Sequence, residues 1–219
     1  MMRRLLPKSL KNILYGTGLF LVAAGLTGIG LYMHDKQIAI KPVKIVSAKT
    51  VVLPTNTPSE APVSANDFAN IPADQPRQII IPTINVSGYI QKVGVDKNNQ
   101  IAVPNNIHLA GWYINSVKPG SPGLSIIDGH VLGRFNDAIF KDLNKLKLGA
   151  NFNVIYGDNS KKSFTVKEVI LLSVNDATAY LNKKDPNIKS QLDLITCGGN
   201  FDKKSQTYDK RVVVKSEGI

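Results

Sequence analysis

The hydrophobic pattern of this chain changes twice along its length. Residues 13–33 contain no charged side chain and predict a helix that, at about 1.5 Å per residue, spans the roughly 30 Å hydrocarbon core of a membrane. Residues 34–76 are rich in proline, serine and threonine and have no sustained apolar period, which predicts an extended, mobile tether. Residues 77–219 have recurring apolar runs and are numerous enough to form one domain with its own core.

Short runs of β-branched and aromatic residues dominate this last region. They lie at 78–81, 89–95, 124–128, 152–156, 164–172, 192–196 and 211–215, each bounded by turn residues. Residues 96–99 and 157–160 have the composition of hairpin connections between such runs. Helical spacing is confined to 138–146 and 176–181. The pattern therefore favours an all-β fold, a closed or nearly closed barrel with one or two short helices.

The charges beside the apolar segment predict its orientation. Residues 1–12 hold four basic side chains and no acidic one, so they are expected to form a cytoplasmic tail, with the domain outside the cell membrane. A cleaved signal peptide is the competing interpretation, but its apolar core is typically about 7–15 residues long. No small-x-small cleavage site closely follows Met33, and no nearby cysteine could carry a lipoprotein anchor. We therefore expect a single-pass, uncleaved signal anchor.

The net charge of +11 does not indicate a nucleic-acid-binding protein. Outside the tail, basic residues occur in pairs such as Lys161-Lys162 and Lys203-Lys204, without interleaved aromatic residues. Such pairs are typical of a solvated surface, and attraction to anionic envelope polymers is a weaker inference from the same charge.

Cys197 is the only cysteine of the chain, so it cannot form an internal disulfide. Outside the cytoplasm an unpaired thiol is exposed to oxidation, which favours a thiol that takes part in chemistry. A reactive cysteine needs a basic partner to form its thiolate. Of the histidines, His130 is the best candidate for this partner, because it follows an apolar strand and a glycine, where a barrel presents functional side chains. His108 is the reserve candidate, and His34 adjoins the membrane segment.

Arg211 begins an apolar strand in a chain that otherwise prefers lysine. Its guanidinium offers a rigid fork of donors, which suits a site where an oxyanion develops. Non-catalytic interpretations stay open: Cys197 as a buried apolar residue, His130 as a turn residue, and Arg211 in an ion pair with Asp209 or Glu217.

No metal or cofactor is expected. One cysteine and three scattered histidines offer no short ligand spacing. The segment that begins at Asp96 faintly suggests a calcium loop, but it lacks the required glycine and has Ile107 at the last position.

Several motifs in order resemble those of the sortases. Residues 194–199 (LITCGG), then Phe201-Asp202 and the run 208–214, are similar to the active-site end of that family. Upstream, 110–113 (AGWY) and 129–131 (GHV) follow the order of the family as well. The resemblance covers residues 77–219, is most similar to class F with classes D and E close by, and implies a closed barrel of about eight strands.

The resemblance implies a cysteine transpeptidase that cleaves a Leu-Pro-x-Thr-Gly-like sorting signal in secreted proteins. Cys197 would form an acyl-thioester. His130 would protonate the leaving amine and later accept a proton from the incoming nucleophile, and Arg211 would hold the oxyanion or the substrate backbone. An amine of a cell-wall precursor or surface protein would then accept the acyl group. Thr196 and Trp112 are expected to contact the substrate.

Asp128 departs from the family pattern, since many relatives have alanine there. Its carboxylate is expected to raise the pKa of His130.

Two other functions stay open from the sequence. One is a catalytically silent barrel that binds surface components. The other is a cell-wall L,D-transpeptidase, although that family surrounds its cysteine with a His-Gly-Cys type of segment that residues 196–198 do not match.

Overall fold

The computed structural model describes residues 57–97 and 99–219. The predicted cytoplasmic tail, the predicted membrane helix and residues 34–56 of the predicted tether lie outside these ranges. Within them, no helix has both the length and the apolar character needed to cross a membrane.

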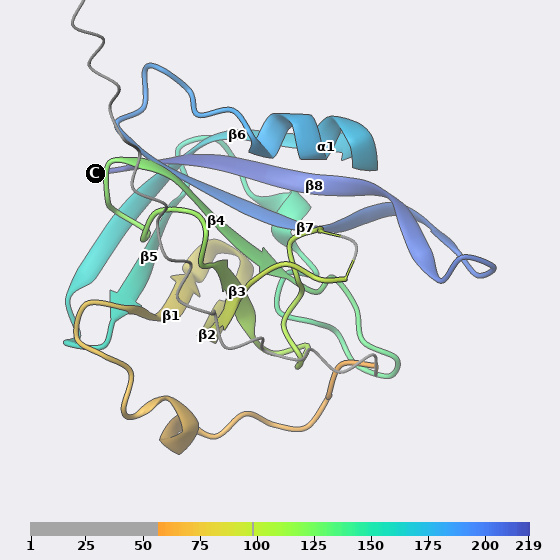
Figure 1. Ribbon diagram of the computed structural model, residues 1–219, viewed down its shortest axis with the longest axis horizontal. Coiled ribbons are helices and arrows are strands. Elements are labelled where there is room, and N and C mark those ends of the chain that lie inside the picture. Colours follow the sequence, from red (N-terminus) through yellow and green to blue (C-terminus); the bar gives the residue numbers. More distant parts are fainter. Residues whose placement is uncertain (1–56, 98) are drawn as a thin grey trace, which may run out of the picture. The chain divides into compact units, whose positions relative to one another are not determined.

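Eight strands close into a barrel in the part of the chain that the structure describes (Figure 1). They are β1 (Pro76–Ile81), β2 (Val86–Val93), β3 (Ala110–Tyr113), β4 (Gly123–Gly129), β5 (Asn151–Tyr156), β6 (Lys161–Ser173), β7 (Ser190–Asp202) and β8 (Thr207–Gly218). The helical elements are the 3-10 helices η1 (Ala65–Phe68), η2 (Pro82–Ile84) and η3 (Leu143–Lys145), and the α-helix α1 (Val174–Leu181). The closed barrel predicted from the strand pattern is confirmed.

The order of the strands around the barrel is β1-β2-β3-β4-β7-β8-β6-β5, and β5 pairs with β1 to close it. The pairs β2/β3 and β4/β7 are parallel, and all the others are antiparallel. The two long strands β7 and β8 form a hairpin that extends past the rest of the barrel (Figure 1).

Alternation along the strands gives the barrel an inner and an outer apolar cluster. The inner cluster fills the barrel and includes Phe140, Phe152 and Phe164, all fully buried. The outer cluster joins β4, β7, β8 and α1 through Ile126, Ile195, Val213, Ala177 and Leu181. Burial of this second cluster explains why α1 lies along the outside of the sheet, against β6 and β8 (Figure 1).

Most of the predicted elements exist, with two differences. The predicted runs all lie within or across strands, but β3 was not predicted as a strand. The helix expected at 138–146 is wrong, since only the 3-10 turn η3 forms there, with Phe140 and Leu143 fully buried. The helix expected at 176–181 exists as α1.

Of the two predicted hairpin connections, one is confirmed. Residues 157–160 join the antiparallel strands β5 and β6, with Asn159 at φ 67°. At the other connection, Val95 and Ile101 form an isolated antiparallel bridge, but the next strand, β3, runs parallel to β2, so no hairpin joins these two strands.

Residues 57–75, expected to belong to the mobile tether, lie against the barrel. Phe68 stacks on Tyr89 of β2 at 4.7 Å between ring centroids. The amides of Gly157 and Asp158 donate to the carbonyls of Gln75 and Ala73 at 3.0 and 3.4 Å. These contacts differ from those of a free tether, because the segment pairs its backbone with loops that the barrel already orders.

Candidate active site

Three neighbouring strands bring the predicted catalytic residues to one outer face of the barrel. Cys197 on β7 lies directly opposite Arg211 on β8. Asp128 on β4 lies opposite Ile195, which precedes Cys197 by two positions on β7. Because successive side chains of a strand point to opposite faces, these residues share the outer face that Ile195 marks. His130 follows the end of β4 directly, on the same edge.

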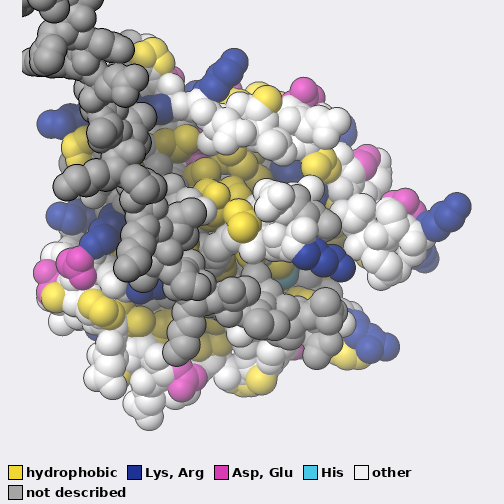
Figure 2. All heavy atoms as spheres, viewed as in Figure 1, with side chains coloured by type: hydrophobic (Ala, Val, Ile, Leu, Met, Phe, Trp, Pro, Cys, Tyr) yellow, Lys and Arg dark blue, Asp and Glu magenta, His cyan; other side chains and the backbone are white. Residues whose placement is uncertain are grey.

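A cavity of about 630 Å³ opens over this face, and Cys197, His130 and Arg211 all line it. Its apolar wall comes from the outer cluster and α1, with Ile126, Ile195, Ala177 and Leu181, and its other wall from residues 99–105. On the face shown in Figure 2, hydrophobic side chains gather toward the middle, while Lys and Arg side chains lie mainly around the edge. The structure thus brings the three predicted residues together in one concave site.

The thiol of Cys197 is half-buried and unpaired. Burial raises its pKa, Arg211 lowers it and Asp128 raises it, with a net shift upward. Cys197 is therefore a protonated thiol near neutral pH. Directly after it, the register of β7 against β8 shifts between Gly198 and Phe201, which forms a bulge of the kind often found beside active sites.

The ring of His130 makes one hydrogen bond to the described residues, and this bond also defines its tautomer. Its Nε2 lies 2.7 Å from the carbonyl oxygen of Pro104. Since a carbonyl can only accept, Nε2 carries the proton, and Nδ1 of the neutral ring is left as the proton acceptor. Burial lowers the pKa of His130 more than the Pro104 contact raises it, so the ring is neutral near neutral pH.

Gly129, just before His130, is required for space. A Cβ at this position would lie 2.5 Å from Cδ2 of the buried Phe140. A side chain here would push β4 away from the inner cluster and move His130 with it.

Arg211 forms no ion pair among the described residues. Its Nη1 donates to the carbonyls of Tyr208 and Lys210 at 3.1 and 2.8 Å. Its two acidic candidate partners bind other residues, since Glu217 pairs with Lys167 at 2.8 Å and Asp209 accepts from Asn200. Arg211 lines the cavity, and its remaining guanidinium donors have no hydrogen-bond partner among the described residues, which leaves them available to a substrate oxygen.

The two expected substrate contacts have other positions. Thr196 borders the cavity but is 2% exposed, and its hydroxyl donates to the Gly129 carbonyl at 2.7 Å. Trp112 does not line the cavity, because it belongs to the inner cluster and donates to the Val117 carbonyl at 3.2 Å. Its neighbour Tyr113 points to the other face of β3 and lines the cavity. The expectation for Trp112 is wrong, since an aromatic pair does not reveal which of its members faces inward.

The reserve candidate His108 lies outside the cavity, with its Nε2 3.2 Å from the carbonyl of Glu60. The expected effect of Asp128 on His130 is also wrong. Burial and the Pro104 contact set the pKa of His130, whereas the charge of Asp128 acts on Cys197.

Two walls of the cavity were missed from the sequence. Val174, Ala177 and Thr178 of α1 and the loop before β3 line it, together with Pro58. The only sequence signal was the helical spacing at 176–181, which does not show where a helix packs. Within the described residues, no group of three or more His, Cys, Asp or Glu side chains is placed to hold a metal ion.

Comparison with known proteins identifies the family. The family model described as Sortase domain matches residues 79–218. No match is found among the curated proteins. The match covers more than half of the chain, so the chain belongs to the sortase family.

Solved sortases have a similar fold. Sortase A from Corynebacterium diphtheriae, as a lid mutant, is 24% identical with a TM-score of 0.51, and the match covers 68% of this chain and 70% of that one. Sortase C-1 from Actinomyces oris is 23% identical with a TM-score of 0.51, over 74% and 83% of the two chains. At these identities the likeness concerns the fold alone.

Proposed function

We propose that this protein is a membrane-anchored cysteine transpeptidase that cleaves a Leu-Pro-x-Thr-Gly-like sorting signal and transfers the acyl part to an amine. The observation that carries the proposal is the arrangement of Cys197 opposite Arg211 on paired strands, with His130 in the same cavity. Membership of a family whose members are generally cysteine transpeptidases supports it.

The ionisation states suggest how the first step proceeds. Cys197 and His130 are both uncharged at rest, so the thiol proton must pass to Nδ1 of His130 as sulfur attacks the carbonyl carbon. Arg211 stabilises the oxyanion with its free N–H groups. The C–N bond then breaks, the imidazolium gives its proton to the leaving amine, and a thioester with Cys197 remains.

The second step returns the enzyme to its resting state. An amine attacks the thioester carbonyl, its surplus proton passes to His130, and the thiolate leaves and is reprotonated. Water in place of the amine gives hydrolysis. The amine donor is proposed to be a cell-wall precursor or a second surface protein. We also propose that the protein is most similar to the class F sortases.

The predicted signal anchor at 13–33 gives the proposal its setting. An anchored domain on the outer side of the membrane meets secreted proteins and lipid-linked acceptors where both are concentrated.

The decisive experiment incubates the protein with a library of Leu-Pro-x-Thr-Gly-type peptides and measures intact mass. An acyl adduct on Cys197 is expected, and hydroxylamine or a diglycine amine should release it as the transfer product. Cys197→Ala should form no adduct while keeping the melting temperature close to that of the wild type.

Paired histidine variants provide the control. His130→Gln should lose transfer, whereas His108→Gln should retain it, because His108 lies outside the cavity. Absence of any adduct across the library, with the wild-type protein folded, would contradict the transpeptidase and leave a binding barrel.

A further inference from the structure

Asp128 is a carboxylate inside the cavity that the proposed reaction does not use. It lies on the same outer face as Cys197 and Arg211, and only 9% of the residue is exposed. A charged carboxylate in such a place is costly unless other groups compensate it. Its position on β4, two residues before His130, makes it part of the floor of the site.

The hydrogen bonds of Asp128 do little to compensate its charge. Among the described residues, the carboxylate accepts one hydrogen bond, from the amide of Gly129. Arg211 does not bond to it; the hydrogen bonds of its guanidinium to the described residues run from Nη1 to the carbonyls of Tyr208 and Lys210. The charge of Asp128 therefore acts electrostatically, through space, on its neighbours in the cavity.

The ionisable side chains that share the cavity with Asp128 are Asp96, Tyr113, His130, Cys197 and Arg211. Burial raises the pKa of Asp128 to about 7, while the Gly129 amide and the Arg211 charge oppose the shift. Asp128 in turn raises the pKa of Cys197. The charge of Asp128 thus opposes formation of the thiolate, and Arg211 favours it.

We propose that Asp128 is a positioning residue of the site: when ionised, its buried charge offsets that of Arg211 and adds to the effect of burial in favouring the thiol form of Cys197. The proposal deepens the proposed function, on which it rests in taking Cys197 as the nucleophile. A resting thiol also resists oxidation outside the cell better than a thiolate does, because the thiolate is the form that oxidants attack.

The test measures the rate of Cys197 alkylation by iodoacetamide across a range of pH, since the midpoint of that profile reports the thiol pKa. In Asp128→Asn, which keeps an oxygen for the Gly129 amide, we expect the midpoint to fall by about 0.5–1 unit. The thiolate fraction below the midpoint then rises about three- to tenfold, while the alkylation rate rises less because a thiolate of lower pKa is a weaker nucleophile.

The matched control is Asp193→Asn. Asp193 is also buried, on β7, and its pKa is also raised to about 7, but it faces Gln191 and Lys215 and lies outside the cavity. Its replacement should leave the Cys197 midpoint unchanged. An unchanged or higher midpoint in folded Asp128→Asn, or an equal fall in Asp193→Asn, would overturn the proposal.

Alkylation needs no sorting signal, so its result is independent of the result of the peptide experiment. A shifted midpoint with no transfer product refutes the transpeptidase but not the charge effect, and an unshifted midpoint with normal transfer refutes only the role of Asp128. If Asp128→Asn does not fold, Asp128→Ser offers a second neutral side chain with an oxygen, judged by the same midpoint.

Discussion

Thr196 and Cys197 are adjacent residues with opposite orientations and separate roles. Cys197 lies on the outer face of the barrel, whereas Thr196 is turned inward and is 2% exposed. The Thr196 hydroxyl donates to the carbonyl of Gly129 at 2.7 Å, which links β7 to β4. The residue before the proposed nucleophile is thereby joined to the residue before His130.

Replacing Thr196 with valine should distinguish the contribution of this hydrogen bond from that of side-chain packing, because valine keeps the shape of threonine and removes the hydroxyl. The buried Gly129 carbonyl loses a donor, which costs about 1–3 kcal/mol in the free energy of unfolding. Peptide transfer should fall as well, since the two strands no longer hold Cys197 and His130 in register. Denaturant unfolding and transfer rates of Thr196→Val, with Thr196→Ser as the control that keeps the hydroxyl, measure both effects. Equal stability of the two variants would contradict the role of the link.

Asp193 should make the stability of the protein depend on pH. Burial raises its pKa to about 7, although Gln191 and Lys215 oppose the shift. An unfolded aspartate has a pKa of about 3.9, so the folded protein binds the proton more tightly, and stability from this group falls as pH rises from about 4 to about 7. Asp193→Asn removes that loss. Its unfolding free energy relative to the wild type should therefore rise over this window, by up to about 4 kcal/mol for a shift of about three units. A constant difference measured by denaturant unfolding from pH 4 to 8 would contradict this.

At the scale of elements, alternation along the strands made most of the barrel predictable. Runs of apolar residues identified β1, β4, β5, β7 and β8, because each has to cover an inner cluster. The strand β3 was missed since Ala110–Tyr113 is short and contains a glycine. The apolar spacing at 138–146 predicts a helix, but the buried Phe140 and Leu143 of the inner cluster need only a 3-10 turn there.

The residues that line the candidate site were predictable to a similar extent. Cys197, His130 and Arg211 could be found from residue type and position, and the structure brings all three into one cavity. Sequence patterns could not choose between Trp112 and Tyr113, which point to opposite faces of β3. They also could not show that α1 forms a wall, because that depends on a tertiary contact.

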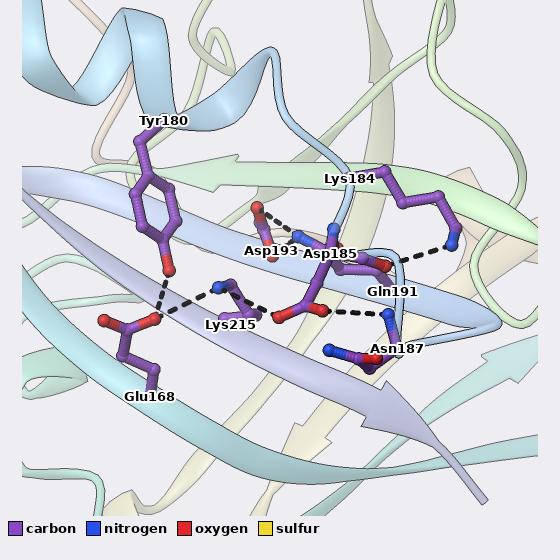
Figure 3. Close-up of polar contacts among 8 residues, drawn as sticks. All are labelled: Glu168, Tyr180, Lys184, Asp185, Asn187, Gln191, Asp193 and Lys215. Carbon is purple, nitrogen blue, oxygen red and sulfur yellow. Dashed lines mark hydrogen bonds and ion pairs between the residues drawn. The ribbon is translucent and has the colours of Figure 1, made fainter.

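A polar network fastens α1 and the loop after it to the outside of the barrel (Figure 3). Lys215 of β8 lies 3.1 Å from Glu168 of β6 and 3.6 Å from Asp185, and its Nζ is 4.9 Å from the ring centroid of Tyr180. The Tyr180 hydroxyl donates to Glu168. Gln191 accepts from the Asp185 amide at 2.7 Å, which connects the loop to β7.

Lys215→Met should loosen the wall of the cavity without changing the reactivity of the Cys197 thiol. The ammonium and its three contacts are lost while the aliphatic stem is kept, so we expect a loss of about 1–2 kcal/mol in stability and a higher KM for the peptide. The rate of iodoacetamide alkylation of Cys197 should be unchanged, because Lys215 does not line the cavity.

Lys167→Met is the matched control for this change. Lys167 also pairs across β6 and β8, with Glu217 at 2.8 Å, but its side chain is 44% exposed, so its loss should have little effect on KM. Equal KM values for the two variants would show that the network does not hold the wall.

At the scale of the whole described region, residues 57–75 run beside the barrel and join distant loops. Near the cavity, Ser59 pairs with Asn106, and Pro58 lines the cavity itself. Lys118 forms an ion pair with Asp74, so the same segment contacts the loop between β3 and β4. Segments far apart in the sequence are thereby fixed around one site, which explains why ordered structure extends before the predicted boundary at residue 77.

Glu60 is the residue through which this segment should control the loop after His130. Its carboxylate accepts the amides of Arg134 and Phe135 and the side-chain amide of Asn136. Partial desolvation opposes ionisation, but these hydrogen bonds outweigh it and lower the pKa of Glu60. The carboxylate is therefore charged at neutral pH and holds the loop in place.

Glu60→Gln should release this loop, because an amide has one acceptor oxygen and no charge. Arg134 lies in the loop and is a trypsin site, so limited trypsin digestion should cut after Arg134 faster in this variant than in the wild type. Fragment masses identify the cut and its rate. Glu217→Gln is the control, since Glu217 pairs with Lys167 on β6 and has no contact with the loop. If both variants are cut after Arg134 at the wild-type rate, residues 57–75 do not hold the loop. A faster cut in Glu60→Gln alone would mean that the ordered unit around the active site begins before the barrel does.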